Sequence, residues 1–216
     1  MRSFVILTVG MLAFGGVANA QSSASKPGNG YVEAVAQSAF GNVTSQSYGA
    51  EAGVTVFPNV QIFVEAGQTR NVATTAFSAA AQTMAGALSQ TQANAGFSVK
   101  EPVTFGAAGL RFLIPVADSK VQPYVMAGGG IAKVSQNATF TVGGTDVTGN
   151  LAQFNIVLGS DLSGSFTKPM FVLGGGVTYP LWQQLIADFQ FRFGRILAED
   201  GGINVSRAGI GIGVRF

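Results

Sequence analysis

The C-terminal segment of the chain, residues 205–216, alternates between apolar side chains and positions held by arginine or glycine. Its even positions carry Ala208, Ile210, Ile212, Val214 and Phe216. A period of two residues is the period of a β-strand. Because one face of this strand is apolar and the other is polar, the pattern is typical of a membrane barrel, in which one face contacts lipid and the other lines the interior.

Seven further segments show a related alternation, and Gly, Pro or Asn falls in the breaks between them. The eight predicted strands cover about residues 30–41, 46–57, 60–70, 102–114, 121–135, 169–180, 185–196 and 205–216. The clearest pattern is in 185–196, where phenylalanines share one face while Asp188, Gln190 and Arg192 share the other. The glycine runs 128–130 and 174–176 carry little information about which side faces inward.

The connections between these strands alternate strictly between short turns and longer loops. Short turns fall at 58–59, 115–120 and 180–184, and the other set comprises 42–45, 71–101, 136–168 and 197–204. Outer-membrane barrels show this alternation between periplasmic turns and extracellular loops. The pattern therefore predicts an all-β fold, an eight-stranded antiparallel up-and-down transmembrane β-barrel, with both termini on the periplasmic side.

The two long loops carry different signals. In loop 71–101, Phe77, Ala81, Met84 and Leu88 form an apolar stripe at helical spacing. This stripe predicts a short helix in an extracellular loop that folds over the barrel rim, with a plug or a membrane-surface helix as alternatives. Loop 136–168 is predicted to form either a protruding hairpin or a cover over the barrel mouth.

The N-terminus has the features of a signal peptide, which we assign to residues 1–20. A basic Arg2 precedes the apolar run 4–14, and the small-residue sequence Ala18-Asn19-Ala20 follows as a cleavage site. Residues 21–29 are expected to form a polar leader, and 30–216 the barrel domain. No later segment has the roughly 18 uninterrupted apolar residues of a membrane helix.

Composition narrows the chemistry. Only 10% of the residues are charged, against about 25% in typical soluble domains, which suits a wall that faces lipid. The 12 basic and 10 acidic residues nearly balance, so no nucleic-acid partner is expected. The chain has no Cys and no His, which removes thiolate metal sites and the commonest catalytic base. We therefore expect no enzyme activity, no cofactor and no metal.

Charged side chains on the polar faces are predicted to form a network in the barrel lumen, the space enclosed by the strands. This set comprises Glu33, Glu51, Glu65, Arg111, Lys133, Asp188, Arg192, Arg207 and Arg215. Unpaired charges in a confined space cost several kcal/mol each, so these groups are expected to pair. The result would be either a solid polar core or a narrow channel gated by the ion pairs.

Two further sets are expected on the outer wall. Arg70, Lys100 and Arg195 fall at the extracellular strand ends, where they would contact lipopolysaccharide phosphates or simply extend to the interface. A periplasmic aromatic girdle is predicted from Phe112, Tyr124, Tyr179, Trp182 and Phe216.

Three segments carry a family resemblance: residues 105–112 (FGAAGLRF), 123–130 (PYVMAGGG) and 211–216 (GIGVRF). With them, the chain from 30 to 216 resembles the small OmpA/OmpX-like outer-membrane β-barrel family. The resemblance implies a location in the cell outer membrane of a Gram-negative-type envelope. It also implies that the strand ending at Phe216 is read by the outer-membrane barrel assembly machinery. The chain stops at the last strand, so peptidoglycan anchoring is not expected.

Members of that family serve as structural anchors, adhesins, serum-resistance factors or narrow channels. The leading hypothesis is a non-catalytic outer-membrane β-barrel protein with a structural or surface-interaction role through its long extracellular loops, whose ligand the sequence leaves unnamed. One alternative is the narrow channel. The other is a soluble lipocalin-like ligand-binding barrel, which requires reversed facing, with Phe189 and Phe193 lining an inner cavity.

Overall fold

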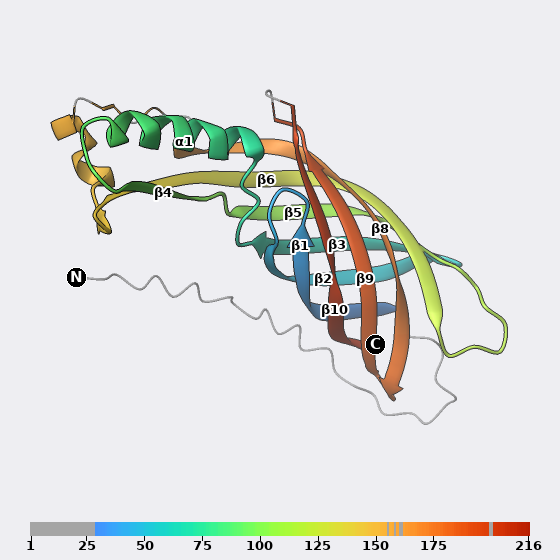
Figure 1. Cartoon of the computed structure of the whole chain (residues 1–216). Coiled ribbons are helices and arrows are strands. Elements are labelled where there is room, and N and C mark those ends of the chain that lie inside the picture. The colour runs from blue at the N-terminus through green and yellow to red at the C-terminus, as the bar shows by residue number, and fades with distance from the viewer. Residues whose placement is uncertain (1–28, 155, 158, 160–161, 199–200) are drawn as a thin grey trace.

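The computed structural model describes residues 29–154, 156–157, 159, 162–198 and 201–216. The predicted signal peptide and the leader up to residue 28 lie outside the described residues. Within them, eight strands form a closed antiparallel ring (Figure 1). The ring consists of β1 (Gly30–Phe40), β2 (Ser45–Phe57), β3 (Val60–Thr69), β5 (Val103–Leu113), β6 (Gln122–Val142), β8 (Ser163–Trp182), β9 (Leu185–Ile196) and β10 (Ile203–Arg215).

The ring follows the order of the chain, and its last strand pairs with its first. β1 and β10 are aligned from Tyr31 opposite Arg215 to Phe40 opposite Ser206. This pairing removes both sheet edges, which a barrel needs when its backbone is surrounded by lipid. The predicted eight-stranded up-and-down barrel is confirmed. Each predicted strand corresponds to one strand of the ring, although β6 and β8 are longer than the sequence pattern indicated.

β6 and β8 continue beyond the ring and carry a projecting unit, which we call the extension. They pair as far as Asn137 opposite Ser163. The short strand β4 (Ala95–Lys100) pairs with residues 137–142 of β6, and β7 (Thr145–Asp146) and the 3-10 helix η1 (Thr148–Phe154) complete the tip. Figure 1 shows the extension as an arm on one side of the barrel opening. Of the two alternatives left open for loop 136–168, its described residues form the protruding hairpin.

Helix α1 (Thr75–Ser89) lies along the extension. The Thr74 hydroxyl caps it by accepting a hydrogen bond from the Phe77 N–H at 3.2 Å. Its buried side chains, Phe77, Ala81, Ala85 and Leu88, pack with Ala138, Phe140, Leu151 and Leu162 of the extension. The helix prediction is confirmed. The first turns of α1 line a cavity at the barrel mouth with Asn42 and Asn204, and the stripe covers the apolar surface that β6 carries past the rim. No helix among the described residues is long and apolar enough to cross a membrane.

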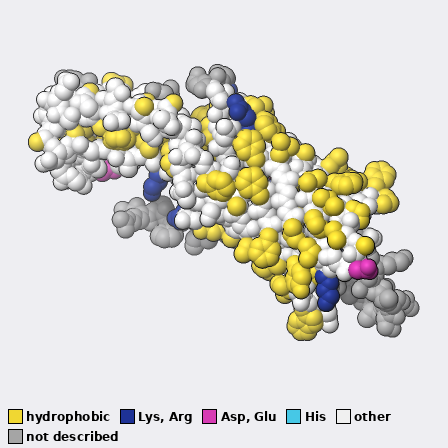
Figure 2. Space-filling view, turned by 45° about the vertical axis from the view of Figure 1, so that its right-hand side comes forward, with side chains coloured by type: hydrophobic (Ala, Val, Ile, Leu, Met, Phe, Trp, Pro, Cys, Tyr) yellow, Lys and Arg dark blue, Asp and Glu magenta, His cyan; other side chains and the backbone are white. Residues whose placement is uncertain are grey.

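The outer wall of the ring is mostly apolar, and the buried charged side chains lie on the inner wall. Phe189 points outward with 55% of its surface exposed, whereas its neighbours Asp188 and Gln190 are buried inside. In Figure 2, hydrophobic side chains spread over the barrel, and the extension at upper left is largely free of them. The reversed facing that a lipocalin-like barrel requires is therefore absent from β9, and that alternative is wrong.

Candidate functional site

The lumen is built around large side chains that lie against glycines of the neighbouring strand. The Tyr31 ring of β1 occupies the place that a side chain at Gly53 of β2 would fill. In the same way, a Cβ at Gly176 of β8 would lie 2.5 Å from the Tyr124 hydroxyl. Glycine therefore creates the room that lets tyrosines lie flat on the inner wall, where their hydroxyls reach the charged groups.

Glu51 is the centre of the lumenal network. Its carboxylate forms ion pairs with Arg192 at 2.8 Å and with Arg111 at 3.3 Å, and it accepts a hydrogen bond from the Tyr31 hydroxyl at 2.5 Å. Two cations thus share one carboxylate. The arrangement is compact because the three strands that supply these charged groups, β2, β5 and β9, face one another across a narrow barrel.

Asp188 closes the other side of this network. It accepts a hydrogen bond from the Tyr124 hydroxyl at 2.6 Å and lies 3.8 Å from Arg111. The Arg111 guanidinium is centred 3.4 Å from the middle of the Tyr124 ring, a cation–π contact that adds attraction in a dry site. The charged groups are thereby held between aromatic faces.

A second layer lies nearer the end of the barrel from which the extension projects. Arg207 pairs with Glu65 at 3.1 Å and lies over the Phe105 ring, 4.2 Å from its centre. Glu33 is also buried but forms no ion pair with the described residues. It accepts a hydrogen bond from the Gln190 side chain at 3.1 Å. Seven of the nine predicted lumenal residues are buried inside the barrel: Glu33, Glu51, Glu65, Arg111, Asp188, Arg192 and Arg207.

Lys133 does not belong to this network, and its prediction is wrong. The inward positions of β6 are the even ones, as buried Met126 and Val134 show, so Lys133 points outward and is exposed. The preceding glycine run concealed this facing in the sequence. Arg215 lies on the inward side of β10 but is half-buried near the strand end, outside the ion pairs of the described residues.

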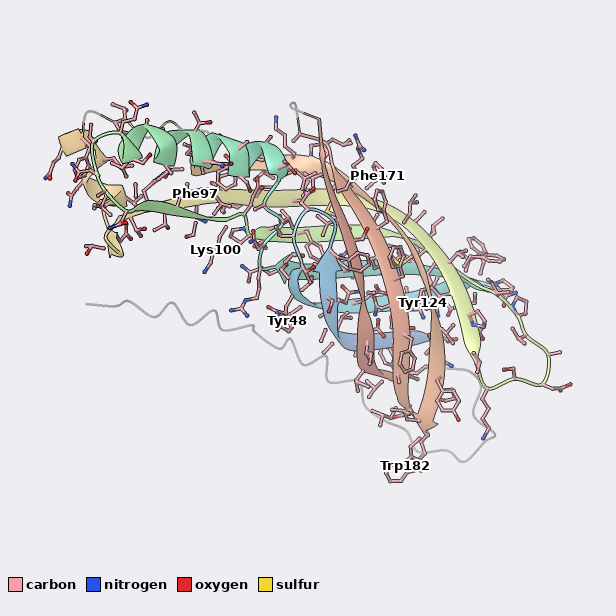
Figure 3. The ribbon with its side chains drawn as sticks, viewed as in Figure 1. Tyr48, Phe97, Lys100, Tyr124, Phe171 and Trp182 are labelled. Carbon is pink, nitrogen blue, oxygen red and sulfur yellow. The ribbon has the colours of Figure 1, made fainter. Side chains whose placement is uncertain are left out.

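The same parity corrects the aromatic girdle. Tyr124 is only 2% exposed and faces the lumen, because it shares the even, inward parity of β6. The other four members, Phe112, Tyr179, Trp182 and Phe216, are exposed. Figure 3 shows Trp182 at the short-turn end of the barrel. The signal that the sequence reading missed is the two-residue spacing between Tyr124 and Met126.

An apolar cluster closes the lumen above the ion pairs, and the sequence analysis did not find it. It consists of Ala39, Val72, Val103, Phe105, Ala132, Val134, Met170, Ile196, Ile203 and Val205. We call it the apolar seal. Two cavities beside it and below it have volumes of only about 10 Å³ each, close to the minimum for one water molecule. The described lumen is therefore filled rather than open at this level.

The outward basic side chains lie near the root of the extension. Arg70 is exposed and contacts the Gln46 side chain at 3.3 Å, and half-buried Arg195 donates to the Asn204 side chain at 3.3 Å. Lys100 is exposed at the end of β4, not at the end of the barrel strand where the sequence had placed it (Figure 3). Lys133 adds a further outward cation.

Glu101 is a buried polar residue that the sequence analysis overlooked. Its carboxylate accepts a hydrogen bond from the Thr74 N–H at 3.0 Å, and its own N–H donates to the Asn71 side chain at 2.9 Å. Burial raises the pKa of this carboxyl. Glu101 therefore ties the start of α1 to the junction of β4 and β5, next to a cavity of about 430 Å³ at the barrel mouth.

Comparisons with known proteins agree with this architecture. No model of a known protein family matches the chain, and no curated protein sequence does. The solved structure of Neisserial surface protein A is similar, with a TM-score of 0.54 and 16% identity over 89% of this chain and 100% of that one. The N-terminal β-barrel domain of Pseudomonas aeruginosa OprF gives a TM-score of 0.50 and 19% identity over 88% and 100%. The chain thus has the fold of the small outer-membrane β-barrels, as its OmpA/OmpX-like pattern implied.

Proposed function

We propose that this chain is a non-catalytic outer-membrane barrel that holds a folded platform outside the cell for surface interactions. The observation that carries the proposal is the extension, which has an apolar core of its own around Phe140, Leu151 and Leu162. A loop that only connected two strands would not need such a core. The barrel supplies a rigid base for this surface.

A polar boundary on the outer wall supports this orientation. Gln68, Thr104, Lys133 and Thr167 lie side by side on four neighbouring strands, and all are exposed. One step toward the short turns, the outward positions become apolar or small, as at Ala66 and Ile131. Such a step marks the edge of a lipid-facing belt. The extension begins beyond this edge, on the side of the long loops.

The proposed partners are lipopolysaccharide and the barrel assembly machinery. Arg70, Lys100 and Arg195, now with Lys133, lie at or beyond the polar boundary, where lipopolysaccharide phosphates would accept charge-assisted hydrogen bonds. Phe216 pairs through its backbone with Gly30, with N···O distances of 2.9 and 3.0 Å. This places the terminal aromatic at the seam of the barrel, where the assembly machinery would bind before the seam closes.

We infer that the lumen is a structural core and not a channel. The ion pairs centred on Glu51 fill the lower lumen, and the apolar seal lies above them. Water and ions could pass only if both the ion pairs and the apolar seal opened. Among the described residues, the cavity beside Glu51, Glu65 and Arg207 has a volume of only about 10 Å³, close to the minimum for one water molecule.

The proposed function is tested by removing the platform and keeping the barrel. Residues 73–99 and residues 138–162 are each replaced by a short Gly-Ser turn to give a shortened chain. Cells that display the full chain and cells that display the shortened chain are applied to an array of matrix glycoproteins and glycans. Heat-dependent gel migration shows whether the barrel still folds. We expect binding by the full chain to at least one array component and none by the shortened chain. Equal binding by both, or binding by neither, would reject the platform role.

A further inference from the structure

The outward-facing surface of β6 continues past the polar boundary into the extension. On β6 the odd-numbered positions face outward along the whole strand, from Val125 to Thr141. Ile131 is 61% exposed, and from Lys133 onward the same face carries only polar side chains. One continuous strand surface therefore changes from apolar to polar in a single two-residue step.

This polar continuation is three strands wide. Asn137 of β6 lies opposite Ser163 of β8 and also opposite Lys100 of β4, and Thr139 lies opposite Ser98. We call this surface the outward polar face; it comprises the odd positions of 133–141 and 163–167 and the even positions of 96–100. The other side of the same sheet is covered by α1 and the extension core. The outward polar face is thus the open side of the extension.

Its side chains are available to a ligand. Among the described residues, no side-chain hydrogen bond or ion pair involves Lys100, Lys133 or the Ser, Thr and Asn side chains of this face. The face holds two lysines and no carboxylate. In Figure 2, dark blue side chains lie near the root of the extension, and an acidic side chain, in magenta, lies farther out on it. Cations at the base and hydroxyls and an amide above suit a ligand with phosphates below and sugar hydroxyls above.

We propose that the outward polar face binds the phosphorylated saccharide headgroup of the glycolipids that surround the barrel in the outer leaflet. The argument for a lipid-borne ligand is continuity. A glycolipid whose acyl chains lie against Ile131 and the apolar belt has its first phosphates at Lys133 and its sugars further along the same strands. The inference rests on the proposed function only for the orientation of the extension.

The length of the face decides between kinds of lipid. Residues 133–141 span roughly 26 Å along the strand at about 3.3 Å per residue, or roughly 20 Å along the barrel axis at a strand tilt of about 40°. A phospholipid headgroup region is roughly 5–8 Å deep in each leaflet, so it would cover only the positions next to Lys133. A saccharide headgroup several sugars long is needed to reach Thr141. The upper serines and threonines therefore select for sugars, while Lys133 contacts phosphate.

The experiment offers the full chain two probes at equal amounts in mild detergent: lipopolysaccharide with a complete core saccharide, and lipid A with the same phosphates and acyl chains. Native mass spectrometry counts the retained molecules of each. We expect retention of the complete glycolipid to exceed that of lipid A about tenfold. The variant Ser98→Glu/Ser163→Glu places repelling carboxylates on the face, and we expect its preference to fall to about one.

Control variants show whether the loss of preference is specific to substitutions on the outward polar face. Thr75→Glu/Gln82→Glu adds the same two charges to exposed positions of α1 and should keep the full preference. Lys133→Gln should weaken retention of both probes equally, because both carry phosphates. Heat-dependent migration shows that each variant is folded.

Several results would overturn the proposal. The first is equal retention of both probes by the unmodified chain. The second is a preference for the complete glycolipid that survives in Ser98→Glu/Ser163→Glu, and the third is a loss of this preference in the α1 variant as large as in Ser98→Glu/Ser163→Glu. Core oligosaccharide released from its lipid is the last probe. If it binds as tightly to the protein in phospholipid nanodiscs, the ligand is a free glycan and the lipid assignment is wrong. Platform-dependent binding on the array is measured separately, so either idea can fail alone.

Discussion

At the scale of single residues, Glu51 has the most demanding position in the barrel. It is buried and is paired with both Arg111 and Arg192. A buried ion pair contributes little net stability relative to an apolar pair of the same shape, but breaking it by removing one partner is costly. The network therefore affects stability mainly because removing one of its members would leave an unpaired charge buried in the lumen.

Neutralising Glu51 should destabilise the barrel strongly. In Glu51→Gln the two arginines lose their shared anion, and we expect the free energy of unfolding to fall by about 3–5 kcal/mol. Urea unfolding in lipid vesicles measures it. Asp118→Asn removes a carboxylate from an exposed turn and should change the value by less than about 0.5 kcal/mol. Equal effects of the two substitutions would contradict the role of Glu51.

Glu101 should make the root of the extension sensitive to pH. Burial raises its pKa, so the folded state binds the proton more tightly than the unfolded state does. Its contribution to stability is then fully present below the unfolded pKa of about 4.3 and is lost as pH rises through the folded pKa. We expect protection of the α1 amides, measured by hydrogen exchange corrected for intrinsic rates, to be higher at acidic pH. In Glu101→Gln this dependence should vanish, and its persistence would exclude Glu101 as the cause.

At the scale of elements, the extension is a separate packing unit on the barrel. α1 contributes one apolar stripe, and the paired strands β4 and β6 contribute the surface that it covers. Neither part has another apolar partner of that size among the described residues. A short strand pair alone is marginally stable, so helix and strands depend on each other.

Removing the central aromatic of this unit should loosen it without opening the barrel. Phe140 is fully buried, and Phe140→Ala should cost about 3–5 kcal/mol locally. We expect faster proteolytic cleavage within 75–100 and unchanged heat-dependent migration of the barrel. Phe97, the cross-strand neighbour of Phe140, is 39% exposed, and Phe97→Ala should accelerate cleavage less than Phe140→Ala does. Loss of barrel migration in Phe140→Ala would mean that the two units fold as one.

At the scale of the whole molecule, the filled lumen and the apolar outer belt support the proposed role of the barrel as a rigid base in the membrane. The lumen is blocked twice, by the ion pairs and by the apolar seal around Val134, Met170 and Ile196. The belt ends at Lys133 and its neighbours, and the extension projects beyond it. The protein's free surface is therefore concentrated on the extension.

A closed lumen predicts the absence of conductance. Reconstituted in planar bilayers, the protein should show no steady current above the baseline of the protein-free bilayer. Ile196→Ser/Glu51→Gln weakens both barriers and should produce brief openings, provided that heat-dependent migration shows the variant to be folded. Steady conductance by the unmodified chain would refute the structural interpretation of the lumen.

The sequence by itself determined the elements that depend on local alternation. The pattern of 185–196 and 205–216 predicted the strands, their facing and the barrel, because a two-residue period has only one structural meaning when one face is apolar. It also brought Glu51, Arg111 and Arg192 into one lumen, since their strands had clear parity. The helical spacing in 71–101 predicted α1 for the same local reason.

Only the tertiary structure decided the features that depend on pairing between distant segments. Lys133 was misplaced because the three glycines before it carry no side chains from which its facing could be deduced. The length of β6, the strand β4 and the apolar seal arise from contacts between segments far apart in the chain, such as the pairing of Asn137 with Lys100. Side-chain burial there is set by the neighbouring strand and not by the strand's own pattern, so a single segment does not reveal it.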